Sequence, residues 1–269
     1  NTSSNSIFAC DFVNNTAALF GGGVNYRQTP YNITFNSNFI NNKAEFGGGV
    51  NFFETFENVV FNGSFINNSA VYGGGIFVKT GQIENTSLTG NHATYGGAIF
   101  FNGTGCVNNI DFTANSAEEG GAIYSQESLN LTGCRFENNH ADDLGGAVFV
   151  LNNFTDTEII STFINNSAFN GGAIAFGGKY FRNNRVNSYF ENNSAERAGG
   201  AIYILGEASN NAFDSIFYGN NAEKASGGGI FFYRPAEGNV FESLFEDNHA
   251  CYGAGMFFLN VANNNRFDS

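Results

Sequence analysis

Large apolar residues alternate with small or polar ones in short runs along the whole chain. In the stretch 35–39, for example, Phe35, Ser37 and Phe39 stand two positions apart, with asparagines between them. An apolar period of two predicts a β-strand with one buried face. Each run ends at a phenylalanine, and Asn-rich pairs such as Asn41 and Asn42 follow. Because asparagine accepts left-handed backbone angles and bonds nearby amides, we expect a turn there.

This strand-and-turn pattern belongs to a template that recurs along the chain. The template reads Phe-x-x-Asn-x-Ala, then variable residues, then Gly-Gly-Ala or Gly-Gly-Gly followed by Ile or Val, as in the stretch 65–76. The Gly-Gly pair permits a sharp bend, and the β-rich run after it predicts another strand. The asparagine of the template, called the ladder asparagine below, recurs every 23 to 28 residues. The ten ladder asparagines are Asn15, Asn42, Asn68, Asn91, Asn115, Asn139, Asn166, Asn193, Asn220 and Asn248.

Repetition at this period indicates a solenoid. A unit of about 26 residues with about three short strands cannot bury its own apolar face, whereas stacked units bury it against each other. Coils stacked ~4.8 Å apart would pair in parallel and in register, phenylalanine over phenylalanine and asparagine over asparagine. We therefore expect an all-β fold, a right-handed parallel β-helix of about ten coils, that occupies residues 1–269 as a single domain.

Some units depart from the template. In units four to six, the residue four positions before the template phenylalanine position is not large and apolar. Altered strand register is therefore expected around residues 80–135. The last part of each unit, such as 79–82 or 233–238, is polar and variable in length, which predicts a loop. The residues at the altered position are Glu84, Asn108 and Thr132.

The ends of the chain and its apolar content carry two further expectations. The chain stops in the middle of the pattern, because Phe267 and Ser269 begin another unit, so we expect an excerpt of a longer repeat protein. No segment approaches the ~18 consecutive apolar residues of a membrane helix, so direct membrane insertion of this segment is not expected.

The net negative charge argues against some classes of binding partner. The formal net charge is −13, with only 11 lysines and arginines. Nucleic acids and anionic membranes require basic patches, so neither is an expected partner. An acidic surface also keeps an elongated protein soluble.

The cysteines do not form a disulfide framework in this pattern. Cys10 and Cys134 share a template position but stand five units apart, while Cys106 and Cys251 occupy other positions. The nearest pair along the stack, Cys106 and Cys134, is offset by ~13 Å at strand rise, too far for a bridge. We expect the four cysteines to be small apolar fillers.

Carboxylates gather at one place in the template. The positions after the alanine bring Glu118, Glu119, Asp142 and Asp143 onto neighbouring coils. Stacked carboxylates ~5 Å apart could hold Ca²⁺ or act as general acid and base. The alternative is a solvated loop with its carboxylates pointing outward, and this is the interpretation we favour. No metal or other cofactor is expected apart from this calcium candidate.

Aromatic residues form a column at an adjacent position. Phe46, Tyr72 and Tyr95 stand two residues after the alanine in consecutive units, and Tyr252 occupies the same place far away. Such a column could contact glycans through its rings. It could instead cover the neighbouring Gly-Gly bend, which is the favoured interpretation.

The chain is rich in Asn-x-Ser/Thr sequons. Several occupy the residue before the ladder asparagine, which alternation points outward, so glycosylation of a secreted protein is expected at such sites. No Gly-x-Ser-x-Gly nucleophile motif or phosphate-binding loop is found. The sequons are at Asn1, Asn14, Asn32, Asn62, Asn67, Asn85, Asn102, Asn130, Asn153, Asn165 and Asn192.

The template resembles a known repeat. Five units carry the full Gly-Gly-Ala-Ile/Val run, at 96–99, 120–123, 145–148, 171–174 and 199–202. Together with Phe-x-x-Asn, this run resembles the paired signature of the chlamydial polymorphic outer-membrane-protein repeat. The Asn-rich composition of the repeats is most similar to that of adhesin-like proteins of methanogenic archaea. The resemblance implies a large secreted or wall-bound protein whose β-helical stalk mediates adhesion, and it carries over no catalytic residues.

These observations predict a non-catalytic extracellular stalk at the cell surface that mediates adhesion or display. Its expected partners are glycans or proteins on a host or neighbouring cell. Two alternatives stay open. One is a filament or sheath subunit that self-associates end to end or laterally. The other is a polysaccharide lyase or hydrolase of β-helix fold, centred on residues 118–143.

Overall fold

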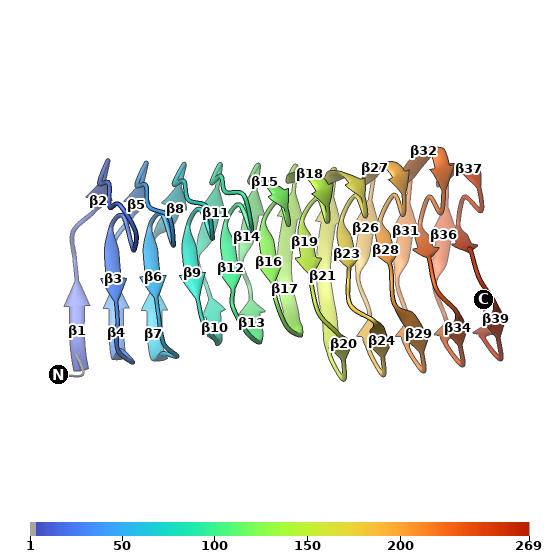
Figure 1. Ribbon diagram of the computed structural model, residues 1–269, viewed down its shortest axis with the longest axis horizontal. Helices are drawn as coiled ribbons and strands as arrows, with labels where there is room; N and C mark the ends of the chain where they lie inside the picture. The colour runs from blue at the N-terminus through green and yellow to red at the C-terminus, as the bar shows by residue number, and fades with distance from the viewer. Residues whose placement is uncertain (1–3, 269) are drawn as a thin grey trace.

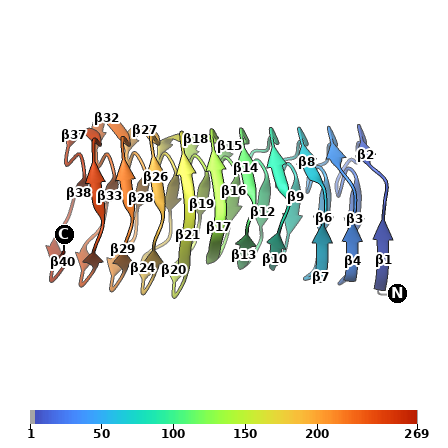
Figure 2. The same cartoon turned by 180° about the vertical axis from the view of Figure 1, so that it is seen from behind.

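The computed structural model describes residues 4–268 as a rod of stacked coils (Figures 1 and 2). Strands are its only regular elements, and no helix occurs in this range. The rod has about ten turns of about 26 residues, numbered here by their ladder asparagines, from coil 1 with Asn15 to coil 10 with Asn248. Strands of successive coils pair in parallel, which confirms the parallel β-helix. The sequon at Asn1 and the repeat position of Ser269 lie outside the described residues.

One face of the rod is a ten-stranded parallel sheet that follows the Gly-Gly bends. Its strands are three residues long, and the first and third side chains of each point into the core. The strands are β3 (Val24–Tyr26), β6 (Val50–Phe52), β9 (Ile76–Val78), β12 (Ile99–Phe101), β16 (Ile123–Ser125), β19 (Val148–Val150), β23 (Ile174–Phe176), β28 (Ile202–Ile204), β33 (Ile230–Phe232) and β38 (Met256–Phe258).

A second face leads to the template phenylalanine. It comprises a three-stranded sheet of β1 (Ser4–Phe8), β4 (Tyr31–Phe35) and β7 (Glu57–Phe61), and a 16-stranded sheet. The latter contains β2 (Phe12–Val13), β5 (Phe39–Ile40), β8 (Ser64–Ile66), β10 (Gly81–Glu84), β11 (Ser87–Thr89), β13 (Gly105–Asn108), β14 (Asp111–Thr113), β17 (Leu129–Glu137), β21 (Glu158–Ile164), β25 (Arg185–Val186), β26 (Tyr189–Glu191), β30 (Ala212–Phe213), β31 (Ile216–Tyr218), β35 (Val240–Phe241), β36 (Leu244–Glu246) and β40 (Arg266–Phe267).

Two smaller sheets complete the rod. A six-stranded sheet follows the ladder asparagines of coils 5 to 10, and a five-stranded sheet lies in the segments that close the later coils. The six strands are β15 (Ser116–Glu119), β18 (His140–Leu144), β22 (Ser167–Asn170), β27 (Ser194–Ala198), β32 (Asn221–Ser226) and β37 (His249–Tyr252). The five strands are β20 (Phe154–Thr155), β24 (Tyr180–Arg182), β29 (Glu207–Ser209), β34 (Ala236–Glu237) and β39 (Ala262–Asn263).

Phenylalanine rings of successive coils stack inside the rod, as expected. The ring centroids of Phe39 and Phe65 lie 4.7 Å apart with planes 4° from parallel, and those of Phe136 and Phe163 lie 4.8 Å apart. Leu88 takes the place of the ring in coil 4 and is also fully buried. Stacked aromatic pairs contribute ~0.5–1.5 kcal/mol beyond the burial of their surface. The ring column and the inward side chains of the ten-stranded sheet form one continuous core.

The ladder asparagines lie directly over one another and are hydrogen-bonded throughout. Asn91 Oδ1 accepts from the backbone N–H of Asn68 at 2.9 Å and from Asn68 Nδ2 at 3.0 Å. Asn91 Nδ2 donates to Asn115 Oδ1 at 3.0 Å and to the carbonyl oxygen of Phe65 at 2.9 Å. Asn68 and Asn91 have no exposed surface. Each amide of coils 2 to 9 therefore links three coils and leaves none of its own polar atoms without a partner.

The two glycines of each bend meet different demands. Gly96 has a φ of 65°, in the left-handed region that disfavours residues with a Cβ. Gly97 has ordinary backbone angles, but a Cβ on it would overlap the carbonyl oxygen of Gly121 in the next coil. The third position faces the core and accepts alanine, as at Ala98. In the Gly-Gly-Ala run, the first residue therefore forms the turn, the second allows the close approach of the next coil, and the third packs in the core.

A second asparagine ladder, which the sequence analysis did not predict, runs through the later coils. Asn184 Nδ2 donates to Asn211 Oδ1 at 3.0 Å and to the carbonyl oxygen of Phe154 at 2.9 Å, as in the first ladder. It continues through Asn239 to Asn265. This ladder stabilises the turns that follow the strands of the five-stranded sheet.

The expectation of loops at the end of each unit is confirmed only in part at the two quoted segments. Residues 79–80 and 233–235 lie outside strands, whereas strand β34 lies within 233–238 and strand β10 begins inside 79–82. Polar side chains point outward from these short strands too, so polarity did not distinguish strand from loop.

The expected change of register between residues 80 and 135 is confirmed. In coils 4 to 6 the buried upstream residues are Ile83, Val107 and Leu131, which pair with one another. They stand five residues before the template phenylalanine position, whereas in the other coils the buried upstream residue stands four residues before it. The usual count returns at β21, where the register with β17 shifts after Thr132. The extra residue of each coil has a left-handed φ; these residues are Asn85, Asn109 and Gly133.

The four cysteines are free, as expected. Cys134 is buried, and burial raises the pKa of its thiol to about 11, in agreement with an apolar filler. Cys10 and Cys251 are exposed and Cys106 is half-buried, so the filler role is wrong for these three. Cys10 shares the template position of buried Cys134 but lies in coil 1, which a described coil covers on one side only. Cys106 and Cys251 lie on strands at positions that face outward.

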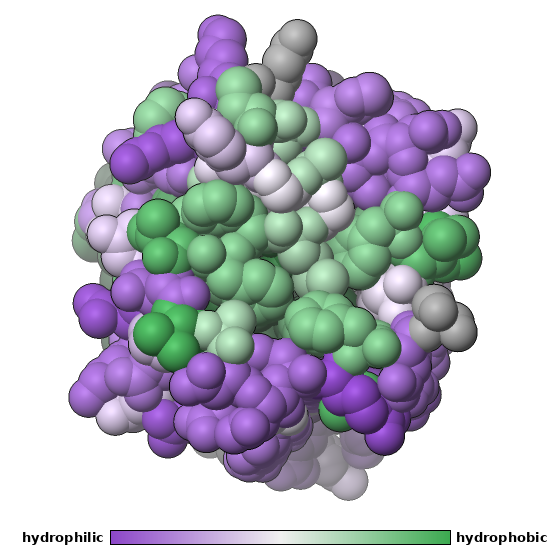
Figure 3. Space-filling model, turned by 90° about the vertical axis from the view of Figure 1, so that its right-hand side faces the viewer, coloured by the Kyte–Doolittle hydropathy of each residue, from purple (hydrophilic) through white to green (hydrophobic). Residues whose placement is uncertain are grey.

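The end of the rod at coil 10 shows its cross-section. Figure 3 shows an apolar centre surrounded by polar side chains. Phe245, Met256 and Phe258 belong to the apolar side chains packed on the core there. Over the described range, no helix long and apolar enough to cross a bilayer is found.

We expect Asn115→Ala to lower the free energy of unfolding by about 2–4 kcal/mol, because it leaves the buried N–H of Asn91 and the carbonyl of Leu88 without partners. Asn102→Ala is the matched control, since Asn102 is exposed, and it should change the free energy by less than ~0.5 kcal/mol. Urea unfolding of both variants measures the difference. Equal losses would contradict the role of the ladder.

We expect Gly97→Ala to destabilise the rod by more than ~3 kcal/mol, since the added methyl group meets backbone of the next coil that cannot move alone. Ala98→Gly makes the reverse change one residue later and should cost only ~1 kcal/mol. Thermal unfolding followed by circular dichroism compares the two. A Gly97→Ala variant as stable as the wild type would refute the close approach.

Candidate functional site

Two columns of side chains define a cleft along the side of the rod, called the lateral cleft below. The wall column lies before each Gly-Gly bend, and the floor column is the outward-facing middle residue of each strand of the ten-stranded sheet. The wall column consists of Phe20, Phe46, Tyr72, Tyr95, Glu119, Leu144, Asn170, Ala198, Ser226 and Tyr252. The floor column consists of Asn25, Asn51, Phe77, Phe100, Tyr124, Phe149, Ala175, Tyr203, Phe231 and Phe257.

In the first half of the rod, aromatic rings line the lateral cleft and narrow it to a cavity of about 360 Å³. The centroids of Phe46 and Tyr72 lie 4.8 Å apart and those of Tyr72 and Tyr95 5.4 Å apart, with nearly parallel planes. Their edges pack on the floor, for example Tyr72 against Phe100 at 5.3 Å and 77°. The structure thus brings the predicted glycan-contact residues Phe46, Tyr72 and Tyr95 together. Because neighbouring rings cover one another's faces, the column presents mainly ring edges to solvent.

The carboxylates of coils 5 and 6 do not align as expected. Coil 6 has an extra residue before its bend, so Glu119 lies opposite Leu144, and the expected alignment with Asp143 is wrong. Glu118, Asp142 and Asp143 are exposed. Among the side chains that the structure describes, no three of His, Cys, Asp or Glu are arranged to hold a metal ion.

Glu119 has an unusual environment among these carboxylates. It takes the place of an aromatic residue in the wall column and is half-buried. Burial raises its pKa above the usual 4.5, and the negative charges of Asp143 and Glu118 raise it further. Burial together with the charge of Glu119 also raises the pKa of Tyr95. The ionised carboxylate is therefore disfavoured at this position.

The sequon asparagines that precede a ladder asparagine, Asn14, Asn67, Asn165 and Asn192, are exposed, as predicted from the alternation. Nine of the described sequon asparagines are exposed, and Asn32 is half-buried. The exposed sequon residues are Asn14, Asn62, Asn67, Asn85, Asn102, Asn130, Asn153, Asn165 and Asn192. Several have a left-handed φ at the tip of a turn, including Asn67 at 53° and Asn165 at 54°. An enzyme that modifies asparagine could reach these side chains.

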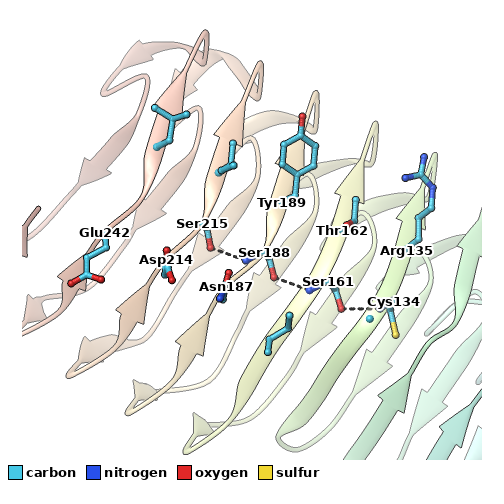
Figure 4. A pocket seen from close by; sticks show the side chains of 14 residues that line it. Cys134, Arg135, Ser161, Thr162, Asn187, Ser188, Tyr189, Asp214, Ser215 and Glu242 are labelled. Carbon is cyan, nitrogen blue, oxygen red and sulfur yellow. Dashed lines mark hydrogen bonds between the residues drawn. The ribbon is translucent and has the colours of Figure 1, made fainter. Parts of the chain in front are cut away.

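A second surface feature is a groove of about 640 Å³ on the other face, floored by a row of serines (Figure 4). The backbone N–H of Ser161 donates to Ser188 Oγ at 3.0 Å, and that of Ser188 donates to Ser215 Oγ at 3.1 Å. Ser188 Oγ donates in turn to the carbonyl oxygen of Ile159 at 3.0 Å. These hydroxyls bond the backbone where the strand bends, and the small side chains leave the groove open.

The two sides of the serine groove differ in character. Asn187, Asp214 and Glu242 lie along one side and Tyr189 along the other. Ile216 and Leu244, which also line the groove, pair in register with Tyr189 along the rod. The small residues two before each phenylalanine were the sequence signal for this groove. The sequence analysis used them to predict a strand and did not recognise the groove.

The stacked columns define a β-helical repeat protein that carries its surface features as lines parallel to the axis. Three stretches match the Chlamydia polymorphic membrane protein (Chlamydia_PMP) repeat: residues 109–126, 133–151 and 187–205. They contain the Phe-x-x-Asn and Gly-Gly-Ala-Ile/Val runs of coils 5, 6 and 8 and cover well under half of the chain. No curated protein and no solved structure matches the chain.

We expect Glu119→Gln to stabilise the rod at pH 7, because it removes a half-buried carboxylate whose pKa is raised. A raised folded-state pKa means that stability falls as pH rises through that pKa, so the advantage of the variant should vanish as the pH falls below ~4.5. Midpoints of urea unfolding between pH 4 and 8 measure it. The same substitution at exposed Glu57 controls for net charge, and a pH-independent difference would refute the expectation.

Proposed function

We propose that the chain is the β-helical stalk of a cell-surface adhesin-like protein. The observation that carries the proposal is the match of three coils to a polymorphic membrane protein repeat, on a rod whose whole described length repeats the same coil. A rod of this kind extends the chain by ~4.8 Å per coil, which gives reach with little mass. Its outward columns and sequence-variable turns are available to partners on a host or neighbouring cell.

The surface chemistry supports an extracellular setting. The sequon asparagines are exposed along the rod, where glycans can be attached without disturbing the core. The acidic net charge of −13 suits display in contact with water rather than binding to nucleic acid. We propose that the partners are surface glycans or proteins.

We propose that the stalk is not itself catalytic. The serine hydroxyls of the groove are committed to backbone hydrogen bonds, as for Ser188 and Ser215. Glu119 and Asp143 do not lie opposite each other in register. Neither arrangement offers a nucleophile with an adjacent base. Adhesion therefore depends on shape and side-chain recognition.

The test uses antibodies raised against the folded chain. On intact cells that produce the protein, immunoelectron microscopy should show label on the outer surface, and Fab fragments should reduce attachment of the cells to surfaces at least about twofold. Fab fragments of an unrelated antibody are the control. Label confined to the cell interior, or attachment that Fab fragments leave unchanged, would overturn the proposal.

A further inference from the structure

The lateral cleft is narrow in coils 1 to 4, where a cavity of about 360 Å³ lies beside the aromatic rings, and wider in coils 7 to 10. In coils 8 and 9 the wall column carries Ala198 and Ser226 in place of the aromatic rings of the earlier coils. The floor remains aromatic, with Tyr203 and Phe231 stacked at 5.4 Å and 9°. The result is a cavity of about 660 Å³ above the floor rings. This volume lies within the usual range of small-molecule sites, ~300–1,000 Å³.

Two arginines line this cavity, Arg197 and Arg234, and both side chains are exposed. Among the described side chains that line it, none is Asp or Glu. Burial raises the pKa of Tyr203, the positive charge of Arg197 opposes that rise, and Tyr233 and the carboxylate of Asp143 add to it. The ion pairs between described side chains do not include Arg197 or Arg234. They do include four other arginines, Arg135, Arg182, Arg185 and Arg266.

Two tyrosines at the same cavity lie outside the coil-to-coil ring stack. Tyr233 is tilted by 41° from Phe231, and Tyr252 by 50° from Phe257. Their exposed fractions are 38% and 67%. Unlike the rings of Phe46 and Tyr72, they are not paired face to face with a ring of the next coil, so their faces are available to a ligand.

We propose that this part of the lateral cleft, lined by Arg197, Arg234, Tyr203 and Tyr233, binds an acidic oligosaccharide through carboxylate-bearing sugar rings. Guanidinium groups bind carboxylates with paired, charge-assisted hydrogen bonds. The C–H face of a sugar ring packs on the face of an aromatic ring, and the cavity extends from coil 7 to coil 10 along the axis, which suits a chain of sugars. An acidic peptide would use the arginines but would leave the tyrosine faces without a matching group. The proposal deepens the adhesion function above, on which it rests for its role at the cell surface.

The test is calorimetric titration of the purified chain with oligogalacturonate, which carries one carboxylate per sugar. Methyl-esterified oligogalacturonate has the same rings without the charge, and poly-glutamate has the charge without the rings. We expect the wild type to bind oligogalacturonate at least about tenfold more tightly than either comparator, as loss of a charged hydrogen bond predicts. No binding of oligogalacturonate, or equal binding of poly-glutamate, would overturn the proposal.

Two variants separate the charge from the shape of the site. Arg197→Gln with Arg234→Gln removes both cations, and Ser226→Tyr places in coil 9 the ring that Tyr72 places at the same column position in coil 3. Each should weaken binding at least about tenfold with an unchanged circular dichroism spectrum. Arg27→Gln, at an exposed arginine in coil 1, should bind within about twofold of the wild type.

Wild-type affinity in either test variant would overturn the assignment of the site. The result is also independent of the antibody test. Cells that attach through the stalk while the purified chain ignores oligogalacturonate would refute this ligand and retain adhesion. Binding of oligogalacturonate by the purified chain, with no label on the cell surface, would retain this ligand and refute the adhesion function.

Discussion

At one corner of each coil from 2 to 9, a buried asparagine amide bonds backbone groups that the turn would otherwise leave without partners. The carboxamide suits this place because it accepts and donates at once, with Oδ1 taking two N–H groups of the preceding coil and Nδ2 donating to a carbonyl of that coil and to the next amide. Aspartate lacks the donors, and an apolar residue lacks both functions. Hydrogen bonds in such a chain also polarise one another. The flat phenylalanine stack and the tight glycine bend both depend on the coil spacing that these amides maintain.

Exact superposition of coils turns every surface property into a column, and sites arise where a column changes its residue type. The lateral cleft illustrates this. Its floor stays largely aromatic from Phe77 to Phe257, whereas its wall changes from rings to Asn170, Ala198 and Ser226. The cavity is therefore produced by small residues at an otherwise regular position. Two arginines lie at this opening in a chain that has few cations, so charge and shape change at the same place.

The coil architecture could be predicted because period-two strands, the ladder asparagines and the Gly-Gly bends all recur with one spacing. The second ladder could have been found from Asn184, Asn211, Asn239 and Asn265, but its apolar partner changes from Phe154 and Phe181 to Ala208 and Ala236, which hid the motif. The alignment of Glu119 with Leu144 was not predictable, since the sequence does not show on which side of the strand an extra residue is accommodated. The lateral cleft was missed because its wall and floor come from different strands of the coil, and only the predicted aromatic part of the wall was visible as a sequence column.

The repeated amide contact also bears on how such a chain can change over generations. Every coil presents the same bonding groups to the coil before it and the coil after it, and the ladder distances hold at 2.9–3.0 Å although the repeats differ in length by several residues. Duplication or deletion of one whole repeat in the gene would join two surfaces that already fit. Variation in rod length therefore requires no new interface, and mutations can accumulate on the outer columns while the junctions between coils stay the same.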